Sequence, residues 1–319
     1  TAGYDRDAER LGMLLAADQV RVGLAGNLAA FTFEGASGEH VRGDEVDYNG
    51  SPAGYGLVPQ DHIVYVSKHD NQTLWDILAY KLPGDLPTAD RVRLQNLALS
   101  TVAFAQGVPF FHAGSDLLRS KSLDRNSYDS GDWFNALDWT GGADGHGNGF
   151  ARGLPLAADN QELWSLMRPL LANPLLLPTA EDAAFSAAVF REWLTIRRDE
   201  PLLRLRTAAS IAERLRFYNT GPDQVPGVIV MHLRDGDGSS GGLDDLDPDS
   251  DGLLVVFNAS PRRVNLAIEE LVGSTWLLHP VQAEGVDAET LRGAYVTAAN
   301  GRVSVPALST VVFTAPVAP

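Results

Sequence analysis

The spacing of apolar and polar positions divides the chain into a helix-rich part and a strand-rich part. In the first part, long segments carry apolar residues at helical spacing, and two short apolar runs interrupt them. The expected helices span residues 5–17, 73–81, 88–106 and 180–198. The apolar runs are IVYV at 63–66 and GVPFF at 107–111. Each run predicts a short buried strand, and strand–helix–strand with short connections indicates a βα unit of a parallel sheet.

After Pro201 the pattern changes to short alternating runs separated by turn residues, which is typical of antiparallel strands. The runs are RLRFYN, GVIVMHL, GLLVVFNAS, RRVNLAI, STWLLHPV, AYVTAA, RVSVPAL and TVVFTAP. They predict an all-β domain, a β-sandwich, with its boundary near residue 205. Two segments carry little periodicity, namely the glycine-rich stretch 23–56 and the irregular region 119–178. A loop as long as the second one is usually functional.

These elements predict an α/β plus all-β fold. Residues 1–204 are expected to form the C-terminal part of a (β/α)8 barrel, and residues 205–319 an antiparallel β-sandwich domain. A barrel of this kind needs eight strands, and two cannot close one. Two strands alone would also leave the apolar runs with a bare sheet edge. We therefore expect the remaining barrel strands in another chain, or in a longer protein of which this chain is a segment.

Charge and composition narrow the partners but not the compartment. The 319 residues carry a formal net charge of −16 with a pI near 4.7, which argues against nucleic acid and anionic membranes as partners. The chain has no cysteine, which excludes disulfides, thiolate metal sites and cysteine nucleophiles. No apolar run could span a bilayer, and TAGYDRDAERLG at the start is neither a signal peptide nor a transit peptide. The compartment stays unknown, with a secreted bacterial protein favoured over a cytoplasmic one.

Polar side chains follow both predicted barrel strands at the point where each strand ends. His69, Asp70 and Asn71 come after the first strand, and His112 ends the second. In a βα barrel the C-terminal ends of the strands face the active site. These residues are therefore candidates for chemistry. The alternative for an isolated His–Asp pair is a structural hydrogen bond.

The loop after the second strand has the composition of a sugar-binding segment. Sugars are held by charge-assisted hydrogen bonds to their hydroxyl groups and by aromatic rings under their apolar faces. A capped and solvated loop is the alternative interpretation. The polar candidates are Arg119, Lys121, Arg125, Asn126, Asp129 and Asp132, interleaved with Tyr128, Trp133, Phe134 and Trp139.

Four segments of the chain resemble the pullulanase and limit dextrinase branch of the alpha-amylase superfamily. They are YVSKHDNQTLWD, QGVPFFHAGSDLLRSKSLDRNSYDSGDWFNALDW, ERLRFYNTGPDQVPGVIVMHL and LLHPVQ. The resemblance runs from about residue 20 to the C-terminus. HDN alone recurs across the superfamily, whereas LLRSKSLDRNSYDSGDWFN is specific to debranching enzymes of this branch.

The resemblance implies hydrolysis of α-1,6 branch linkages in pullulan and limit dextrins, with retention of configuration. Asp70 matches the aspartate that stabilises the oxocarbenium-like transition state, and His69 matches the neighbouring histidine that hydrogen-bonds the same sugar. Arg125 and Asn126 match positions that hold the next glucose unit, and Asp159 in AADNQELW joins them. The implied partners are α-glucans, including maltooligosaccharides.

The other two carboxylates of the family's active site are missing from this chain. In the family the nucleophile and the acid/base end two barrel strands upstream of the position of Asp70, and neither motif is found there. The chain alone is therefore expected to be inactive, because the covalent route needs its nucleophile. Two alternatives stay open: a non-catalytic α-glucan-binding fragment, and another α-1,6-acting member such as an isoamylase.

No cofactor is expected for the chemistry, although the resemblance makes a structural calcium ion possible. DPDSDG at 247–252 spaces its aspartates like the start of a calcium loop. The twelfth position holds Asn258 instead of glutamate, which excludes a complete EF-hand loop. We interpret the segment as a solvated acidic turn and assign no metal ligand.

Overall fold

The computed structural model describes residues 6–141, 145–240 and 242–317, and the chain forms two compact units. The helical unit comprises residues 65–102 and 110–191. The sheet unit comprises residues 1–64, 103–109 and 192–319. The boundary expected near residue 205, between barrel and sandwich, stays a prediction.

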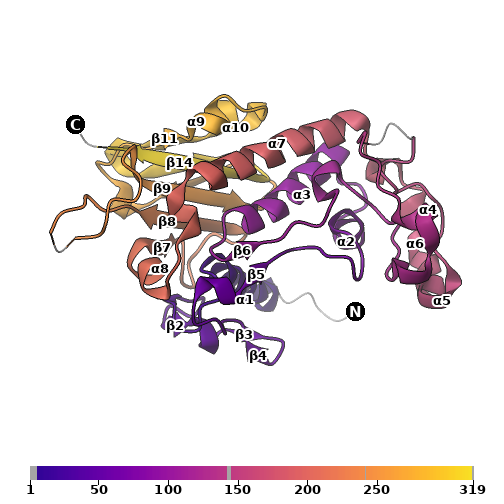
Figure 1. Ribbon diagram of the computed structural model, residues 1–319, viewed down its shortest axis with the longest axis horizontal. Coiled ribbons are helices and arrows are strands. Elements are labelled where there is room, and N and C mark those ends of the chain that lie inside the picture. Colours follow the sequence, from indigo (N-terminus) through magenta and orange to yellow (C-terminus); the bar gives the residue numbers. More distant parts are fainter. Residues whose placement is uncertain (1–5, 142–144, 241, 318–319) are drawn as a thin grey trace. The chain divides into compact units, whose positions relative to one another are not determined.

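The helical unit carries three of the four predicted helices at nearly their expected positions (Figure 1). Its helices are α2 (Leu74–Lys81), α3 (Thr88–Ala103), α4 (Gly131–Asn135), α5 (Ala157–Asn160), α6 (Trp164–Leu171) and α7 (Ala180–Asp199), of which α3 and α7 continue into the sheet unit. A buried cluster that includes Trp75, Leu118, Phe150 and Met167 forms the core. The indole of Trp75 also donates a hydrogen bond to the carbonyl of Leu176 at 3.1 Å, which satisfies its polar edge.

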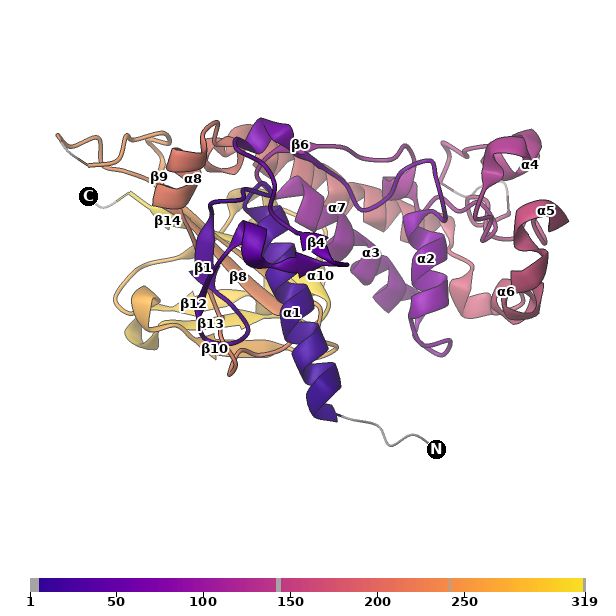
Figure 2. The same cartoon turned by 90° about the horizontal axis from the view of Figure 1, so that it is seen from below.

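Two antiparallel sheets dominate the sheet unit, and each of the eight runs predicted after Pro201 contains a strand. One sheet has the order β11-β14-β9-β8-β7 and the other β10-β13-β12, with the latter three side by side in Figure 2. The strands are β7 (Leu215–Tyr218), β8 (Val228–Arg234), β9 (Ser250–Asn258), β10 (Val264–Ala267), β11 (Leu277–Leu278), β12 (Tyr295–Thr297), β13 (Arg302–Val305) and β14 (Ser309–Pro316). The short helices α8 (Ala208–Arg214), α9 (Pro280–Ala283) and α10 (Ala288–Gly293) flank them in sequence.

The two sheets share one hydrophobic core. Val230 and Val256 from the larger sheet pack in the same cluster as Val303 of the smaller one. Because side chains alternate along a strand, the neighbouring Phe257 points to the opposite face, where its ring lies 6.4 Å from that of Phe104. Both faces of the central strands are therefore covered, which explains the nearly continuous apolar run in GLLVVFN.

The two predicted barrel strands pair in parallel, as expected, but they are short. β5 (Ile63–Val64) lies beside β6 (Val108–Pro109), with Ile63 opposite Val108. These two residues are 56 % and 45 % exposed. Such exposure is unusual, since the strands of parallel sheets are normally covered on both faces. The pair therefore presents apolar surface that further strands or helices could cover.

The first helix is longer than its pattern predicts. α1 spans Arg6–Leu24, and the expected start at Asp5 lies outside the described residues. Beyond Ala17 the apolar spacing is broken by Asp18 and Arg21, which are buried and form an ion pair at 2.7 Å. Charged residues that pair with each other can occupy the buried face of a helix. A prediction from apolar spacing alone therefore places the end of this helix too early.

Sequence periodicity also missed two hairpins in the glycine-rich stretch. β1 (Thr32–Glu34) pairs with β2 (His40–Arg42), and β3 (Asp47–Tyr48) pairs with β4 (Ser51–Pro52). Asn49 and Gly50 connect the second pair with φ angles of 53° and 82°. Both φ angles are positive, as a two-residue type I′ turn requires, and Asn-Gly is the preferred sequence for that turn. This dipeptide could have identified the hairpin.

Candidate active site

His69 and Asp70 follow β5 along the chain and are exposed in the helical unit. Their side chains are 84 % and 58 % exposed, with His69 Nε2 3.4 Å from an oxygen of Asp70. The other Asp70 oxygen accepts a hydrogen bond from Lys68 Nζ. This hydrogen bond, aided by the charges of His69 and Lys121, lowers the pKa of Asp70 below its ordinary value. Asp70 is therefore an accessible carboxylate that is ionised at neutral pH.

Lys121 supports the backbone of this segment. Its side chain is buried, and its ammonium group donates a hydrogen bond of 3.0 Å to the carbonyl oxygen of His69. Burial lowers the pKa of Lys121, whereas the carboxylates of Asp76 and Asp124 act in the opposite direction. Asp76, which is fully buried, accepts hydrogen bonds from the Ser120 hydroxyl and, at 2.8 Å, from the Lys121 amide. The loop after β6 thus holds the residues after β5.

His112 links the same two segments through its ring. The guanidinium of Arg119 lies 3.2 Å from His112 Nε2, and the Ser67 hydroxyl lies 3.4 Å from Nδ1. A guanidinium can only donate, so Nε2 accepts and the ring proton lies on Nδ1, facing Ser67. Burial, followed by the charges of Arg119 and Lys121, lowers the pKa of His112 to about 4. His112 is therefore a neutral structural bridge at physiological pH.

The predicted sugar-binding residues Asn126 and Asp159 contact each other. Asn126 Nδ2 donates to Asp159 Oδ2 at 3.2 Å, and Arg125, next to Asn126 in the chain, is exposed. The buried pair Asp124 and Asn160 fixes this segment. Asn160 Nδ2 donates to Asp124 at 2.9 Å, and its oxygen accepts the amide of Arg125 at 3.1 Å.

The loop that carries these residues has a strained backbone. Leu118, Ser122 and Leu123 all have φ between 54° and 69°, although none is glycine, and all three are buried. Such conformations are uncommon for non-glycine residues and persist only where surrounding contacts enforce them. Strain of this kind clusters at functional sites. Further along the loop, Tyr128 and Trp139 are 90 % and 72 % exposed, so their ring faces are accessible to a ligand.

In the helical unit, residues that follow β5 and β6 along the chain line a cavity of about 340 Å³ together with the long loop, and this volume is large enough for part of an oligosaccharide. Among the predicted site residues, His69, Asp70 and Asn126 line it, while Arg125 and Asp159 lie outside its lining. The full lining is His69, Asp70, His112, Arg119, Lys121, Asn126, Ser127, Tyr128 and Asn135. The structure thus brings separate stretches of the helical unit to one cavity, but the role of each residue stays a prediction.

Sequence reasoning missed the buried polar residues that hold the site. Asp76 looks like an ordinary acidic residue in the first turn of α2, and Asp124 looks like part of a solvated loop. One signal was available, since Lys121 lies between two small hydroxyl residues, Ser120 and Ser122, which are suitable hydrogen-bonding neighbours for buried charges. Within the described residues, no group of three or more His, Cys, Asp or Glu side chains could hold a metal ion. A structural calcium ion stays a prediction without assigned ligands.

Comparison with known proteins places the chain in a family. The family model described as "Alpha-1,6-glucosidases, pullulanase-type, C-terminal" matches residues 145–316, more than half of the chain. The chain therefore belongs to the pullulanase-type alpha-1,6-glucosidases, a family of glycoside hydrolases, and carries their C-terminal domain. The resemblance seen in the sequence is thereby confirmed.

Two curated relatives cover nearly all of the chain. Pullulanase 1, chloroplastic, from Arabidopsis thaliana is 39 % identical over 306 residues, or 96 % of this chain and 31 % of that protein. Pullulanase from Klebsiella pneumoniae is 38 % identical over 303 residues, or 94 % of this chain and 26 % of that protein. The chain thus spans about a third or less of the length of these relatives, which include a chloroplastic and a bacterial protein. In the described part of the chain, no helix is long and apolar enough to cross a membrane.

Solved pullulanases share the fold. The crystal structure of PulA from Klebsiella oxytoca matches with a TM-score of 0.88 and 36 % identity, over 97 % of this chain and 28 % of that one. Klebsiella pneumoniae pullulanase in complex with maltotriose matches with a TM-score of 0.86 and 36 % identity, over 96 % of this chain and 28 % of that one. The expected mixture of helices with antiparallel sheets is confirmed at this level.

Proposed function

We propose that this chain supplies part of the active site of a debranching enzyme that hydrolyses α-1,6-glucosidic linkages in pullulan and limit dextrins. The observation that carries the proposal is the cavity lined by His69, Asp70 and Asn126 in a chain of the pullulanase-type family. The α-glucan class of ligand is supported by a structural relative solved with maltotriose.

Asp70 stabilises the transition state in this proposal. Glycosidic bond cleavage passes through an oxocarbenium-like state, whose positive charge a fixed carboxylate stabilises. The hydrogen bond from Lys68 keeps the pKa of Asp70 low, so the carboxylate is charged when it is needed. His69 hydrogen-bonds the same sugar, while Arg125, Asn126 and Asp159 hold the next glucose unit.

The reaction proceeds with retention of configuration and uses two further carboxylates from outside this chain. A retaining mechanism needs a nucleophile and an acid/base about 5–5.5 Å apart. Asp70 is the third carboxylate and replaces neither. We propose that β5 and β6 are two strands of the (β/α)8 barrel that carries all three, and that the rest of the barrel covers the exposed Ile63 and Val108.

The test replaces Asp70 by asparagine in the protein that contains the complete barrel. Asparagine keeps the shape and removes the charge, so kcat on pullulan should fall by about a thousandfold or more while the fold is unchanged. Asp223→Asn, at an exposed position of the sheet unit, is the matched control and should leave kcat unchanged. Near-normal turnover of the Asp70→Asn variant would contradict the proposal.

A second candidate function is a non-catalytic α-glucan-binding fragment, and the exposed ring of Tyr128 in the cavity lining favours it. Calorimetric titration of this chain with maltotriose, followed by product analysis, separates binding from hydrolysis. We expect binding without hydrolysis for the isolated chain. In the complete protein, activity on pullulan compared with native glycogen distinguishes a pullulanase from an isoamylase-like enzyme.

A further inference from the structure

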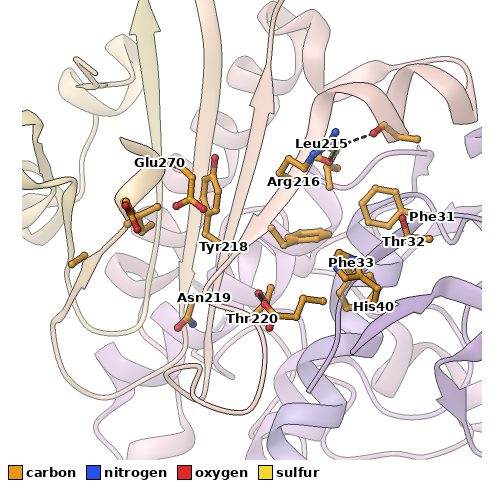
Figure 3. Close-up of a pocket in the computed structure, with 16 residues that line it drawn as sticks. Phe31, Thr32, Phe33, His40, Leu215, Arg216, Tyr218, Asn219, Thr220 and Glu270 are labelled. Atoms are coloured by element: carbon orange, nitrogen blue, oxygen red, sulfur yellow. Dashed lines mark hydrogen bonds between the residues drawn. The ribbon is translucent and has the colours of Figure 1, made fainter. Parts of the chain in front are cut away.

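A second cavity, of about 720 Å³, lies in the sheet unit and shares no residue with the candidate active site. Three segments line it: the β1–β2 hairpin, β7 with the turn that follows it, and residues 267–270 after β10. Figure 3 shows Phe31 and His40 on one side of it and Tyr218 and Glu270 on the other. We refer to it as the Phe217 cavity, because the ring of Phe217 in β7 forms part of its lining.

The aromatic floor of the cavity is packed into a rigid cluster. The ring of Phe217 lies 6.0 Å from that of Phe31 and 6.1 Å from that of Phe33, both in edge-on geometry. Phe31 and Phe33 are buried, whereas Phe217 is only half-buried. The hairpin is also tied to the turn after β7, since the Thr220 hydroxyl donates to Glu34 at 2.5 Å. One apolar ring is therefore presented to the cavity on a fixed support.

The turn after β7 is held equally firmly from the side of α1. Arg21, buried and paired with Asp18, donates a hydrogen bond of 2.8 Å to the carbonyl of Asn219. Gly221 has a φ of 74°, and a Cβ there would lie 2.8 Å from the carboxylate of Glu34. Only glycine allows that carboxylate to sit against the turn. The walls are therefore formed before any ligand arrives, which reduces the entropic cost of binding.

The polar groups around the cavity point to the charge of its ligand. Three carboxylates, those of Glu34, Glu269 and Glu270, line it, against one guanidinium, that of Arg216, and the imidazole of His40. This balance disfavours phosphates and other anions. Carboxylate and guanidinium groups form strong, often bidentate hydrogen bonds to neighbouring hydroxyls. Together with an aromatic ring, they suit a neutral ligand rich in hydroxyl groups.

The edge of β7 argues against a peptide strand as the ligand. β7 is the outer strand of its sheet, and a peptide could in principle extend that sheet. However, Arg216 Nη1 donates hydrogen bonds to the carbonyls of Ala212 and Leu215, at 2.6 and 2.7 Å. A strand that paired here would have to displace the guanidinium from Leu215. Such blunting of an edge leaves a cavity for a compact ligand and no ladder for a peptide.

We infer that the Phe217 cavity is a second α-glucan-binding site, separate from the catalytic cleft, which accepts about two or three sugar units. The choice of glucan among sugars rests on the proposed function. Two glucan sites on one chain raise the apparent affinity for a polymer, because the second binding event becomes intramolecular.

The test follows methyl NMR signals of Leu215 and Ile268, which line the cavity, while maltotriose is added to the 319-residue chain. Both signals should shift and saturate. Glu270→Ala, at an exposed position, should weaken this binding about tenfold or more, because a charged hydrogen-bond partner is lost. Glu284→Ala, an exposed glutamate outside the cavity, is the matched control and should bind like the unaltered chain.

An Asn126→Ala variant separates this inference from the proposed function. If the two methyl signals shift equally in that variant, the Phe217 cavity binds maltotriose independently of the candidate active site. The inference is overturned if neither signal shifts at saturating maltotriose, regardless of whether the candidate active site binds sugar. It is also overturned if trilysine, a cationic probe for the carboxylates of the lining, shifts the signals and maltotriose does not. Equal affinity of the Glu270→Ala and Glu284→Ala variants would overturn it as well.

Discussion

Lys121 offers the sharpest perturbation of the candidate active site that leaves the five residues with proposed roles, from His69 to Asp159, unaltered. Lys121→Met removes the ammonium that holds the His69 carbonyl and keeps a side chain of similar length. A hydrogen bond to a charged group contributes about 1.5–3 kcal/mol. Loss of the cation also removes its electrostatic attraction to the nearby carboxyl groups of Asp76 and Asp124.

An opposing contribution reduces this loss. Burial disfavours the ammonium itself, as the direction of its pKa shift indicates, and methionine relieves that penalty. The His69 carbonyl can be hydrated after the change, because its residue is largely exposed. We expect a net local destabilisation of about 2 kcal/mol, which corresponds to about thirtyfold more frequent opening of the segment.

Hydrogen exchange read by mass spectrometry measures this opening directly. Peptides over residues 66–76 and 118–126 should exchange about thirtyfold faster in Lys121→Met, while peptides from β8 should exchange as before. Lys81→Met, at the exposed end of α2, is the matched control and should change neither region by more than about twofold. A Lys121→Met chain that exchanges like the Lys81→Met control would refute the supporting role of the ammonium.

Four further substitutions test the sheet unit. Burial raises the pKa of Glu192 to about 7, so the folded state binds one proton more than the unfolded state between pH 4.5 and 7. The free energy of unfolding should therefore fall as the pH rises through this range. In Glu192→Gln, the midpoints of urea unfolding should lose this pH dependence. Burial lowers the pKa of His232 to about 4, so stability should fall as pH drops from 6.5 to 4, and His232→Gln should flatten that slope in acid titrations followed by circular dichroism. A Cβ on Gly43 would lie 2.2 Å from the Leu28 carbonyl oxygen, so Gly43→Ala should lower the free energy of unfolding in urea by at least about 2 kcal/mol. Gly12 lies in α1 with open space around it, so Gly12→Ala should raise the free energy of unfolding by about 0.5–1 kcal/mol. Unchanged midpoints for Gly43→Ala would contradict the close approach.

Helices and strands with one apolar face were predictable because burial imposes a repeating pattern. α7 and the strands after Pro201 agree with their predicted positions for this reason. The β1–β2 hairpin was not predictable, because its strands are three residues long and its glycines, such as Gly43 just after β2, are required by close backbone approaches. A close approach depends on a distant partner, here Leu28, that local periodicity cannot indicate.

The candidate site also contains residues that local sequence patterns indicate and residues whose position depends on distant partners. The exposed residues His69 and Asp70 could be chosen as candidates because they belong to a polar cluster that follows an apolar run, although their role stays a prediction. The buried network of Asp76, Lys121 and Asp124 was not predicted, since Asp76 and Asp124 alone resemble solvated charges in sequence and Lys121 was expected only as a sugar-binding candidate of the loop. Lys121 and its partner Asp76 lie 45 positions apart, a separation that only the folded chain closes.

The segment from Asp70 to Asp76 shows why residue type alone could not assign these roles. The two aspartates lie close together in sequence, yet the pKa of Asp70 is lowered by its hydrogen bond from Lys68, and that of Asp76 is raised by complete burial. An exposed carboxylate with a low pKa can offer its charge to a substrate, whereas a buried carboxylate that accepts a backbone amide can only hold a loop. If both were catalytic, Asp76→Asn would abolish turnover without changing stability. We expect the opposite, because Asp76 reaches the cavity only through Lys121, whose amide it accepts.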